Sequence, residues 1–341
     1  MPELSSHKQW AAENLKGVKN VLLPSFRPPD LTELDEKGIR WDVRHSIDQG
    51  FHSTMCEPTP NLNLDEARRF VDIATNEAGD DIRVSLYIQG NSLGENRKLM
   101  EYAEDVGVNT VLLGYPYTWD PDSPKEIYEV TKDFCDLVDL PIILYPSPKF
   151  NVEQFHPSGF PVNILDRMAD IDNAVGAKIS SSGADNFLVA DEIFRRVGDR
   201  LQVSYPGGEI PGLVRNCDMQ WLAAGPVDVY QTPDNPYYVE FFDLLRKGNY
   251  NEAMEVYWKL GPLRKAMGQL AKAGKKLGNY NYAEMKYWKW LTGGNGGYLR
   301  QPAMEISNSR RRTIRWAMKE VGLEVREDDS EFYVGRVNYK E

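Results

Sequence analysis

Eight short apolar segments alternate with longer segments of helical periodicity from residue 17 to residue 248, and this alternation restricts the fold more than any other feature. The apolar segments are rich in Val, Ile, Leu or Tyr and lack a regular polar alternation, which is typical of strands buried on both faces. They span residues 17–26, 50–57, 83–90, 109–116, 140–147, 174–181, 201–208 and 219–225. Strands that alternate with helices favour parallel pairing through right-handed crossovers.

Eight strand–helix units are the number that closes a (β/α)8 barrel, also called a TIM barrel. We therefore predict an α/β protein with a TIM barrel over residues 17–248. The alternative is an open, doubly wound sheet, although no GxGxxG motif follows the first strand candidate. Residues 1–16 are expected to form an N-terminal segment. Residues 249–341 are expected to form a C-terminal helical extension that ends in a charged surface tail.

Two of the helical segments carry signals for their ends. The helix that begins at Leu64 is expected to stop at Gly79, and the pair Ser123–Pro124 is expected to start another. Both segments place apolar residues at helical spacing, as in a helix with one buried face.

The charge balance and the cysteines exclude several classes of protein. The net charge of −11 opposes binding to phosphate backbones and to anionic lipid, so we expect no nucleic-acid partner and no membrane association. Three widely spaced cysteines, Cys56, Cys135 and Cys217, exclude a disulfide framework and a Cys-rich zinc module. The polar start of the chain and the absence of a long apolar run favour a soluble, cytoplasmic protein.

Lys178 is the first candidate for chemistry, because it lies within the apolar strand candidate 174–181. In a TIM barrel the active site lies at the carboxyl ends of the strands. A lysine in an apolar strand costs several kcal/mol unless it is neutral, paired or functional. A neutral amine attacks a carbonyl carbon and forms a Schiff base. The alternative is a lysine that extends to solvent or pairs with a buried carboxylate.

Tyr145 ends the preceding strand candidate, 140–147. A phenol at this place is suited to carry a proton to a carbinolamine or to a substrate hydroxyl. The alternative is a core tyrosine whose hydroxyl reaches the rim of the barrel.

Polar and aromatic side chains also follow the second and fourth strand candidates. His52, Thr54 and Glu57 offer donors and acceptors for a small anion or a carbonyl group. A metal site at His52, Cys56 and Glu57 is an alternative without a recognised ligand spacing, so we expect no metal. Tyr117 and Trp119 belong to an aromatic group that would line a pocket for a planar substrate, or else lie in the core or a subunit interface.

In order and spacing these positions resemble the dihydrodipicolinate synthase / N-acetylneuraminate lyase family of Schiff-base-forming TIM-barrel enzymes. The resemblance covers about residues 17–303. Its motifs are LLPSF in the first strand, the turn that ends at Glu57, the pair Pro116–Tyr117, LYPSP with Tyr145, VGAKIS with Lys178 and GGYLRQP at 296–302. It implies that Lys178 forms an imine with a 2-oxo acid, usually pyruvate, and that Tyr145 relays the proton. It also implies that no metal or organic cofactor is needed and that the chain forms a homodimer or homotetramer.

Several positions depart from the family's pattern. The turn Gly-Thr-Thr-Gly-Glu, which holds the substrate carboxylate, reads Ser53-Thr54-Met55-Cys56-Glu57 here. Thr118 and Trp119 follow the Pro-Tyr pair where the biosynthetic members have a second tyrosine, and Lys149 lies near the place of a missing arginine. These departures argue against dihydrodipicolinate synthesis. The resemblance is closer to the hydratase-aldolase branch, which cleaves aromatic 2-oxobutenoates.

The sequence therefore predicts a hydratase-aldolase-like lyase that makes or breaks a C–C bond next to a 2-oxo acid. Lys178 is its nucleophile and Tyr145 its proton relay. The predicted substrate-binding residues are Thr54, Met55, Glu57, His52, Tyr117, Trp119, Ser180 and Gly207. Alternatives are the same imine used for dehydration, decarboxylation or hydrolysis, and a ligand-binding barrel without turnover.

Overall fold

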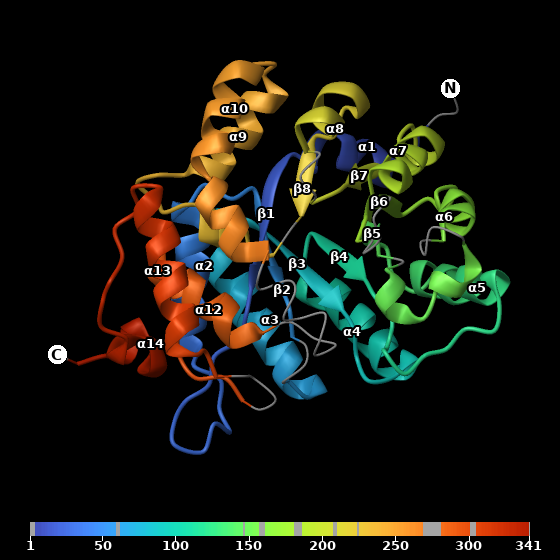
Figure 1. Cartoon of the computed structure of the whole chain (residues 1–341). Helices are drawn as coiled ribbons and strands as arrows, with labels where there is room; N and C mark the ends of the chain where they lie inside the picture. Colours follow the sequence, from blue (N-terminus) through green and yellow to red (C-terminus); the bar gives the residue numbers. More distant parts are fainter. Residues whose placement is uncertain are drawn as a thin grey trace. The chain divides into compact units, whose positions relative to one another are not determined.

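The computed structural model of the chain describes residues 4–58, 62–145, 147–156, 161–180, 186–206, 210–223, 225–268, 281–300 and 305–340. All eight predicted strands are present, and most are a few residues shorter than their apolar segments (Figure 1). They are β1 (Gly17–Leu22), β2 (Ser53–Cys56), β3 (Arg83–Ile88), β4 (Thr110–Leu113), β5 (Ile142–Leu144), β6 (Ala174–Lys178), β7 (Gln202–Ser204) and β8 (Trp221–Ala223).

The strands lie in one sheet in the order β7-β6-β5-β4-β3-β2-β1-β8. Chain neighbours are sheet neighbours from β1 to β7, and β8 pairs with β1 in parallel. This is the strand order of a TIM barrel, so the predicted fold is confirmed. A doubly wound sheet would instead reverse its strand order near the middle.

Side chains connect the two ends of this strand order, β7 and β8. The indole N–H of Trp221 donates to the backbone oxygen of Gln202 (3.0 Å), and the backbone N–H of Ala223 donates to Ser204 Oγ (2.9 Å). The Gln220 side-chain amide donates to Gln202 Oε1 (2.6 Å). Polar side chains thus satisfy backbone groups at the seam, where an unpaired strand edge would leave them exposed.

Helices follow the strands as predicted. Those of the barrel repeats are α2 (Glu36–Asp48), α3 (Leu64–Ala78), α4 (Leu93–Val106), α5 (Pro124–Cys135), α6 (Val162–Met168), α7 (Asn186–Val197) and α8 (Ile210–Cys217). The later ones are α9 (Tyr237–Arg246), α10 (Tyr250–Lys259), α12 (Tyr282–Leu291), α13 (Asn308–Glu320) and α14 (Ser330–Val334). Short 3-10 helices are η1 (Pro148–Phe150), η2 (Glu153–Phe155), η3 (Val227–Tyr230) and η4 (Arg336–Asn338). None of the helices in the described ranges is both long and apolar enough to cross a membrane.

The predicted helix ends have the expected chemistry. Asn63 and Glu66 form a reciprocal capping box at the start of α3, and Gly79 ends that helix with a φ of +49°. Ser123 caps α5 by accepting from the backbone N–H of Glu126, with Pro124 in the first turn. One helix was not predicted: α1 (Ser6–Asn14) forms in the polar N-terminal segment.

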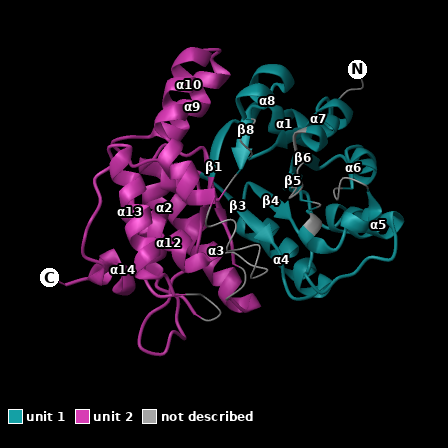
Figure 2. Ribbon diagram, in the orientation of Figure 1, with its two compact units in different colours: residues 1–19, 83–223 teal, residues 20–82, 224–341 magenta. Residues whose placement is uncertain are grey.

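The chain divides into two compact units, which Figure 2 shows in different colours. Unit 1 contains residues 1–19 and 83–223, and unit 2 contains residues 20–82 and 224–341. The boundary predicted at residue 248 between barrel and C-terminal extension stays a prediction.

The expectation of a charged surface tail is wrong for α14. The Phe332 ring packs at 5.1 Å from the Tyr287 ring and 5.6 Å from the Trp290 ring, measured between centroids. The neighbouring Glu331 carboxylate accepts a hydrogen bond from the Trp290 indole N–H (3.0 Å). The many charged residues around Phe332 favoured the prediction of a surface tail. One buried aromatic side chain is nevertheless enough to fix the position of so short a helix.

Candidate active site

Lys178 and Tyr145 lie next to each other at the ends of paired strands in unit 1. Tyr145 directly follows β5 and Lys178 is the last residue of β6, and the parallel register joins Leu144 to Ala177. The Lys178 Nζ atom lies 4.3 Å from the centroid of the Tyr145 ring. The Tyr145 oxygen accepts hydrogen bonds from the Lys178 and Ser180 side chains. The structure thus brings together the predicted nucleophile, the predicted relay and Ser180.

A second lysine, Lys149 of η1, lies close to Tyr145 and to three further aromatic rings. Its Nζ atom is 4.8 Å from the centroid of the Tyr145 ring. Three further rings surround the same amine: Tyr87 at 5.0 Å, Phe150 at 5.1 Å and Tyr117 at 5.8 Å. Distances below about 6 Å are typical of cation–π contacts.

These charges change the acidity of Tyr145. Burial by itself raises the pKa of a phenol, and Tyr145 is only 3% exposed. The positive charges of Lys149 and Lys178, with the hydrogen bonds from Ser180 and Lys178, outweigh burial and lower the pKa of Tyr145 to about 7. Tyr145 is therefore able to exchange a proton near neutral pH.

Lys19 of β1 is a buried amine that the sequence reasoning did not select. It is 3% exposed, donates to Ser85 Oγ (3.0 Å) and lies 5.6 Å from the centroid of the Trp221 ring. Burial, followed by the positive charge of Lys178, lowers the pKa of Lys19 to about 7. The signal that identified Lys178, a lysine within an apolar strand, was also present here.

Tyr87 and Phe150 were also missed. The Tyr87 ring packs edge-on against Tyr145 with 6.0 Å between centroids, and Phe150 does so at 5.8 Å. Tyr87 lies inside an apolar strand, where sequence alone does not separate a site tyrosine from a core tyrosine.

The aromatic residues predicted after β4 contact different rings, and Phe150 links them because Tyr115 also packs edge-on against it, with 5.5 Å between centroids. Tyr117 stacks on Phe150 at 6.0 Å and is 45% exposed, so it lies at the edge of the Lys149 cluster. Trp119 stacks on Tyr115 at 4.8 Å, and its indole N–H donates to Glu126 (3.3 Å). Tyr115 is fully buried and its hydroxyl is hydrogen-bonded to Thr131. Trp119 thus contacts a core tyrosine.

The predicted substrate-binding residues of β2 and its ends belong to unit 2. Thr54 and Met55 are buried in the strand, Glu57 follows it and His52 is half-buried before it. The backbone N–H of Glu57 donates to the Leu22 oxygen (3.1 Å), and its carboxylate accepts from the Tyr282 hydroxyl (3.0 Å). The carboxylate thus fixes the chain after β2. Substrate binding by these four residues stays a prediction.

Cys56 lacks the environment of a nucleophile. Burial raises the pKa of its thiol far above the ordinary range, whereas a reactive cysteine needs a lowered one. Within the described ranges no group of three or more His, Cys, Asp or Glu side chains is placed to hold a metal ion. Gly207 lies outside the described residues.

The late glycine–arginine segment has a structural role in unit 2. Arg300 forms an ion pair with Glu66 (2.6 Å), and its guanidinium carbon lies 3.9 Å from the centroid of the Phe26 ring. Gln301 and Pro302 of the same motif lie outside the described residues.

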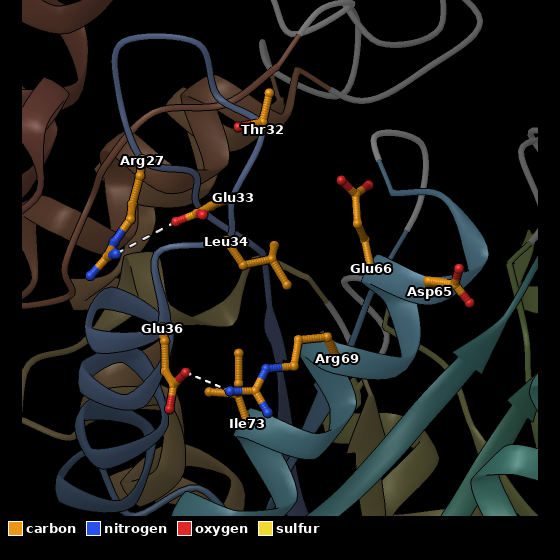
Figure 3. Close-up of a pocket in the computed structure, with 9 residues that line it drawn as sticks. All are labelled: Arg27, Thr32, Glu33, Leu34, Glu36, Asp65, Glu66, Arg69 and Ile73. Atoms are coloured by element: carbon orange, nitrogen blue, oxygen red, sulfur yellow. Dashed lines mark hydrogen bonds and ion pairs between the residues drawn. The ribbon is translucent and has the colours of Figure 1, made fainter.

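Unit 2 also contains a pocket of about 430 Å³ (Figure 3). Within it Arg69 pairs with Glu36 (2.7 Å) and Arg27 with Glu33 (3.6 Å), so its charges largely satisfy one another. None of the predicted site residues is among those that line it: Arg27, Thr32, Glu33, Leu34, Glu36, Asp65, Glu66, Arg69 and Ile73.

Comparisons with known proteins agree with this architecture. The family model described as "Dihydrodipicolinate synthetase family" matches residues 14–321. The 4-hydroxy-tetrahydrodipicolinate synthase of Methanospirillum hungatei is 25% identical over 261 residues, which cover 74% of this chain and 84% of the relative.

Two solved structures have a similar fold. Dihydrodipicolinate synthase from Aquifex aeolicus superposes with a TM-score of 0.72 at 21% identity, covering 92% of this chain and all of that one. N-acetylneuraminate lyase from Fusobacterium nucleatum gives 0.72 at 17% identity, covering 90% and 99%. Because the family model spans most of the sequence, the chain belongs to the dihydrodipicolinate synthetase family.

Proposed function

We propose that this protein is a Schiff-base-forming carbon–carbon lyase that acts on a 2-oxo acid. The observation that carries the proposal is the position of the Lys178 amine, 4.3 Å from the centroid of the Tyr145 ring and hydrogen-bonded to its oxygen. Membership of a family in which relatives are named as synthases and lyases supports the class of reaction.

The reaction begins with a proton transfer from the Lys178 ammonium to the Tyr145 phenolate. The neutral amine then attacks the carbonyl carbon of the 2-oxo acid and forms a carbinolamine. Tyr145 returns the proton to the leaving hydroxyl group, water departs, and a C=N bond remains. When the C–C bond breaks, the protonated imine accepts the electron pair of that bond and becomes an enamine. When the bond forms, the enamine supplies the pair and the protonated imine is restored.

The substrate is proposed to carry a planar, apolar group, as in the hydratase-aldolase branch. The rings of Tyr117 and Phe150 stack beside Lys149 and Tyr145 and offer a surface for such a group. Thr54, Met55, Glu57, His52 and Gly207 remain the residues proposed to bind the rest of the substrate. A homodimer or homotetramer is the proposed assembly.

Reductive trapping tests the proposal. The protein is incubated with pyruvate, or with one of a panel of aromatic and aliphatic 2-oxo acids, and is then reduced with borohydride. We expect a stable mass increase on the peptide that contains Lys178, because borohydride converts an imine to a secondary amine.

Two variants make the result specific. Lys178→Ala removes the proposed nucleophile, and Lys98→Ala removes an exposed lysine of α4. The adduct is expected in Lys98→Ala and absent in Lys178→Ala. No adduct with any 2-oxo acid, or an adduct that survives Lys178→Ala, would contradict the proposal.

A further inference from the structure

Two amines from different parts of the chain lie close to the Tyr145 ring. Lys178 approaches from the end of β6, with its Nζ atom 4.3 Å from the ring centroid. Lys149 approaches from η1 at 4.8 Å. The phenol is almost completely buried, so neither charge is screened as it would be in water.

The two amines differ in what holds them. Lys178 is hydrogen-bonded to the phenol oxygen itself. The Lys149 amine lies within 6 Å of the rings of Tyr87, Phe150 and Tyr117 as well as Tyr145. Aromatic faces carry negative electrostatic potential, so a group of four rings favours the charged form of an amine and restricts its motion.

We propose that Lys149 is a positioning residue for the proton relay: its caged ammonium group supplies the permanent positive charge that stabilises the Tyr145 phenolate. This inference rests on the proposed function of Tyr145. It assigns to Lys149 the stabilisation of the phenolate charge at every step where that charge forms, which Lys178 is unable to provide while its amine is neutral. The charge on the Lys178 nitrogen changes during the reaction, because the amine is neutral when it attacks the substrate. Lys149 keeps its charge beside Tyr145 throughout, including the step in which Tyr145 gives up its proton and becomes a phenolate again.

The groups that face Tyr145 are consistent with these separate roles of Lys149 and Lys178. Lys149 and Phe150 come from η1, Tyr87 from β3, and Lys178 and Ser180 from the end of β6. Of the two charges that lower the pKa of Tyr145, that of Lys149 has the larger effect. Lys19 is repelled by the charge of Lys178, which contributes to the lowered pKa of Lys19.

The test is a tyrosine titration without substrate, followed by near-ultraviolet absorbance, which distinguishes phenolate from phenol. The wild-type protein is compared with Lys149→Met, Lys149→Arg and Tyr145→Phe. Methionine keeps the length and the aromatic contacts of the side chain but removes its charge. One tyrosine is expected to ionise near pH 7 in the wild type and to disappear from the titration in Tyr145→Phe.

Lys149→Met is expected to raise this midpoint by about one to two pH units, which lowers the phenolate fraction at pH 7 roughly five- to fiftyfold. Lys149→Arg is expected to restore the midpoint to within a few tenths of a unit. The pH profile of imine formation with pyruvate should move in parallel. An unchanged midpoint in Lys149→Met would overturn the proposal, as would a variant that raises only the KM for pyruvate and leaves the pH profile in place.

The titration separates this inference from the proposed function, because it needs no substrate. If trapping on Lys178 fails while the Lys149 variants shift the midpoint, the lyase proposal fails and the electrostatic role stands. If trapping succeeds and the midpoint does not move, the role of Lys149 is overturned and the lyase proposal stands.

Discussion

Each of the two units buries lysines, but it surrounds them with different groups. In unit 2, Lys286 and Lys289 of α12 are 1% and 4% exposed, and each faces a carboxylate. Lys286 Nζ lies 3.9 Å from Asp42 and Lys289 Nζ lies 3.5 Å from Asp228. Both amines also donate to backbone oxygens of the segment that follows Asn20, at Pro24 and Val21. These contacts fasten α12 to the barrel segment of its own unit.

In unit 1, the buried Lys19 and the half-buried Lys178 contact hydroxyl groups and aromatic rings. Among the described residues, no carboxylate forms an ion pair with either amine, while Lys19 donates to Ser85 and Lys178 to Tyr145. A buried ion pair fixes both partners in their charged forms, because separating them leaves a charge unpaired. An amine beside a phenol is able to exchange its proton. The carboxylate partners of Lys286 and Lys289 therefore indicate a structural role, whereas the phenol partner of Lys178 is compatible with proton exchange.

The largest effect is expected from Tyr145→Phe. Removing the hydroxyl should slow imine formation with pyruvate by roughly 10²- to 10⁴-fold, the usual contribution of a positioned acid–base group. Because the pKa of Tyr145 is lowered to about 7, the wild-type rate should fall about tenfold per pH unit below that value. The variant should lose this dependence. Rates of reductive trapping over a pH series measure both, and a wild-type profile retained in Tyr145→Phe would exclude Tyr145 as the relay.

Lys286→Met breaks one of the structural pairs. It leaves the Asp42 carboxylate buried without its cation, although Asp42 still accepts from the backbone N–H of Asn295 (2.7 Å). Loss of one partner of a buried pair costs about 3–5 kcal/mol, so the midpoint of thermal unfolding should fall by several degrees. Lys98→Met on the surface is the matched control, expected to be within about 0.5 kcal/mol of the wild type. Equal midpoints for the two variants would contradict the structural role.

Lys19→Met is expected to stabilise the protein, in contrast to the destabilising Lys286→Met. The pKa of Lys19 is lowered from 10.5 to about 7 in the folded chain, so between these values the unfolded chain holds a proton that the folded chain has released. Wild-type stability therefore rises with pH across that interval. The gain from methionine should be about 2 kcal/mol or more at pH 7 and below, and should vanish as pH approaches 10.5.

Urea unfolding of Lys19→Met and wild type at several pH values measures this difference. A gain that is independent of pH would show that the amine's charge is not its cause.

The smallest effect is expected from Tyr282→Phe, which tests a polar anchor of unit 2. The variant removes the hydrogen bond from the tyrosine hydroxyl to the Glu57 carboxylate. Loss of a buried hydrogen bond to a charged group costs about 1–3 kcal/mol. Urea unfolding should detect this loss, and a variant as stable as the wild type would show that the bond does not hold the chain after β2.

Local sequence patterns were sufficient to predict the strands of the barrel and the Lys178–Tyr145 pair. Buried parallel strands are apolar along their whole length, so a lysine at the end of one is conspicuous. The position of Tyr145 at the end of the preceding strand made it a candidate, and the family resemblance favoured a proton relay over a core tyrosine. Both residues lie on strands that are neighbours in sequence and in the sheet, which makes their proximity a consequence of the fold class.

The remaining parts of the site depend on groups that meet from distant segments. Tyr87 lies within β3 and reads as a core residue, and the ring of Phe150 comes from a short helix that follows β5. No repeating pattern in the local sequence predicts that the rings of Tyr87 and Phe150 both pack on Tyr145 and both lie near the Lys149 amine. Lys19 is also a lysine in an apolar segment, but it is the third residue of the segment 17–26 and does not lie at its carboxyl end, where the active site of a TIM barrel is expected.

The most direct test of the contrast between the two units measures imine formation and thermal unfolding on Lys178→Met and Lys286→Met in parallel. We expect Lys178→Met to lose the borohydride-trapped pyruvate adduct and to unfold at or above the wild-type temperature, because it removes an amine that has no carboxylate partner among the described residues. Lys286→Met should keep the adduct and unfold at a lower temperature. An adduct that persists in Lys178→Met, or a loss of the adduct in Lys286→Met without a change in unfolding temperature, would contradict the assignment of chemistry to unit 1.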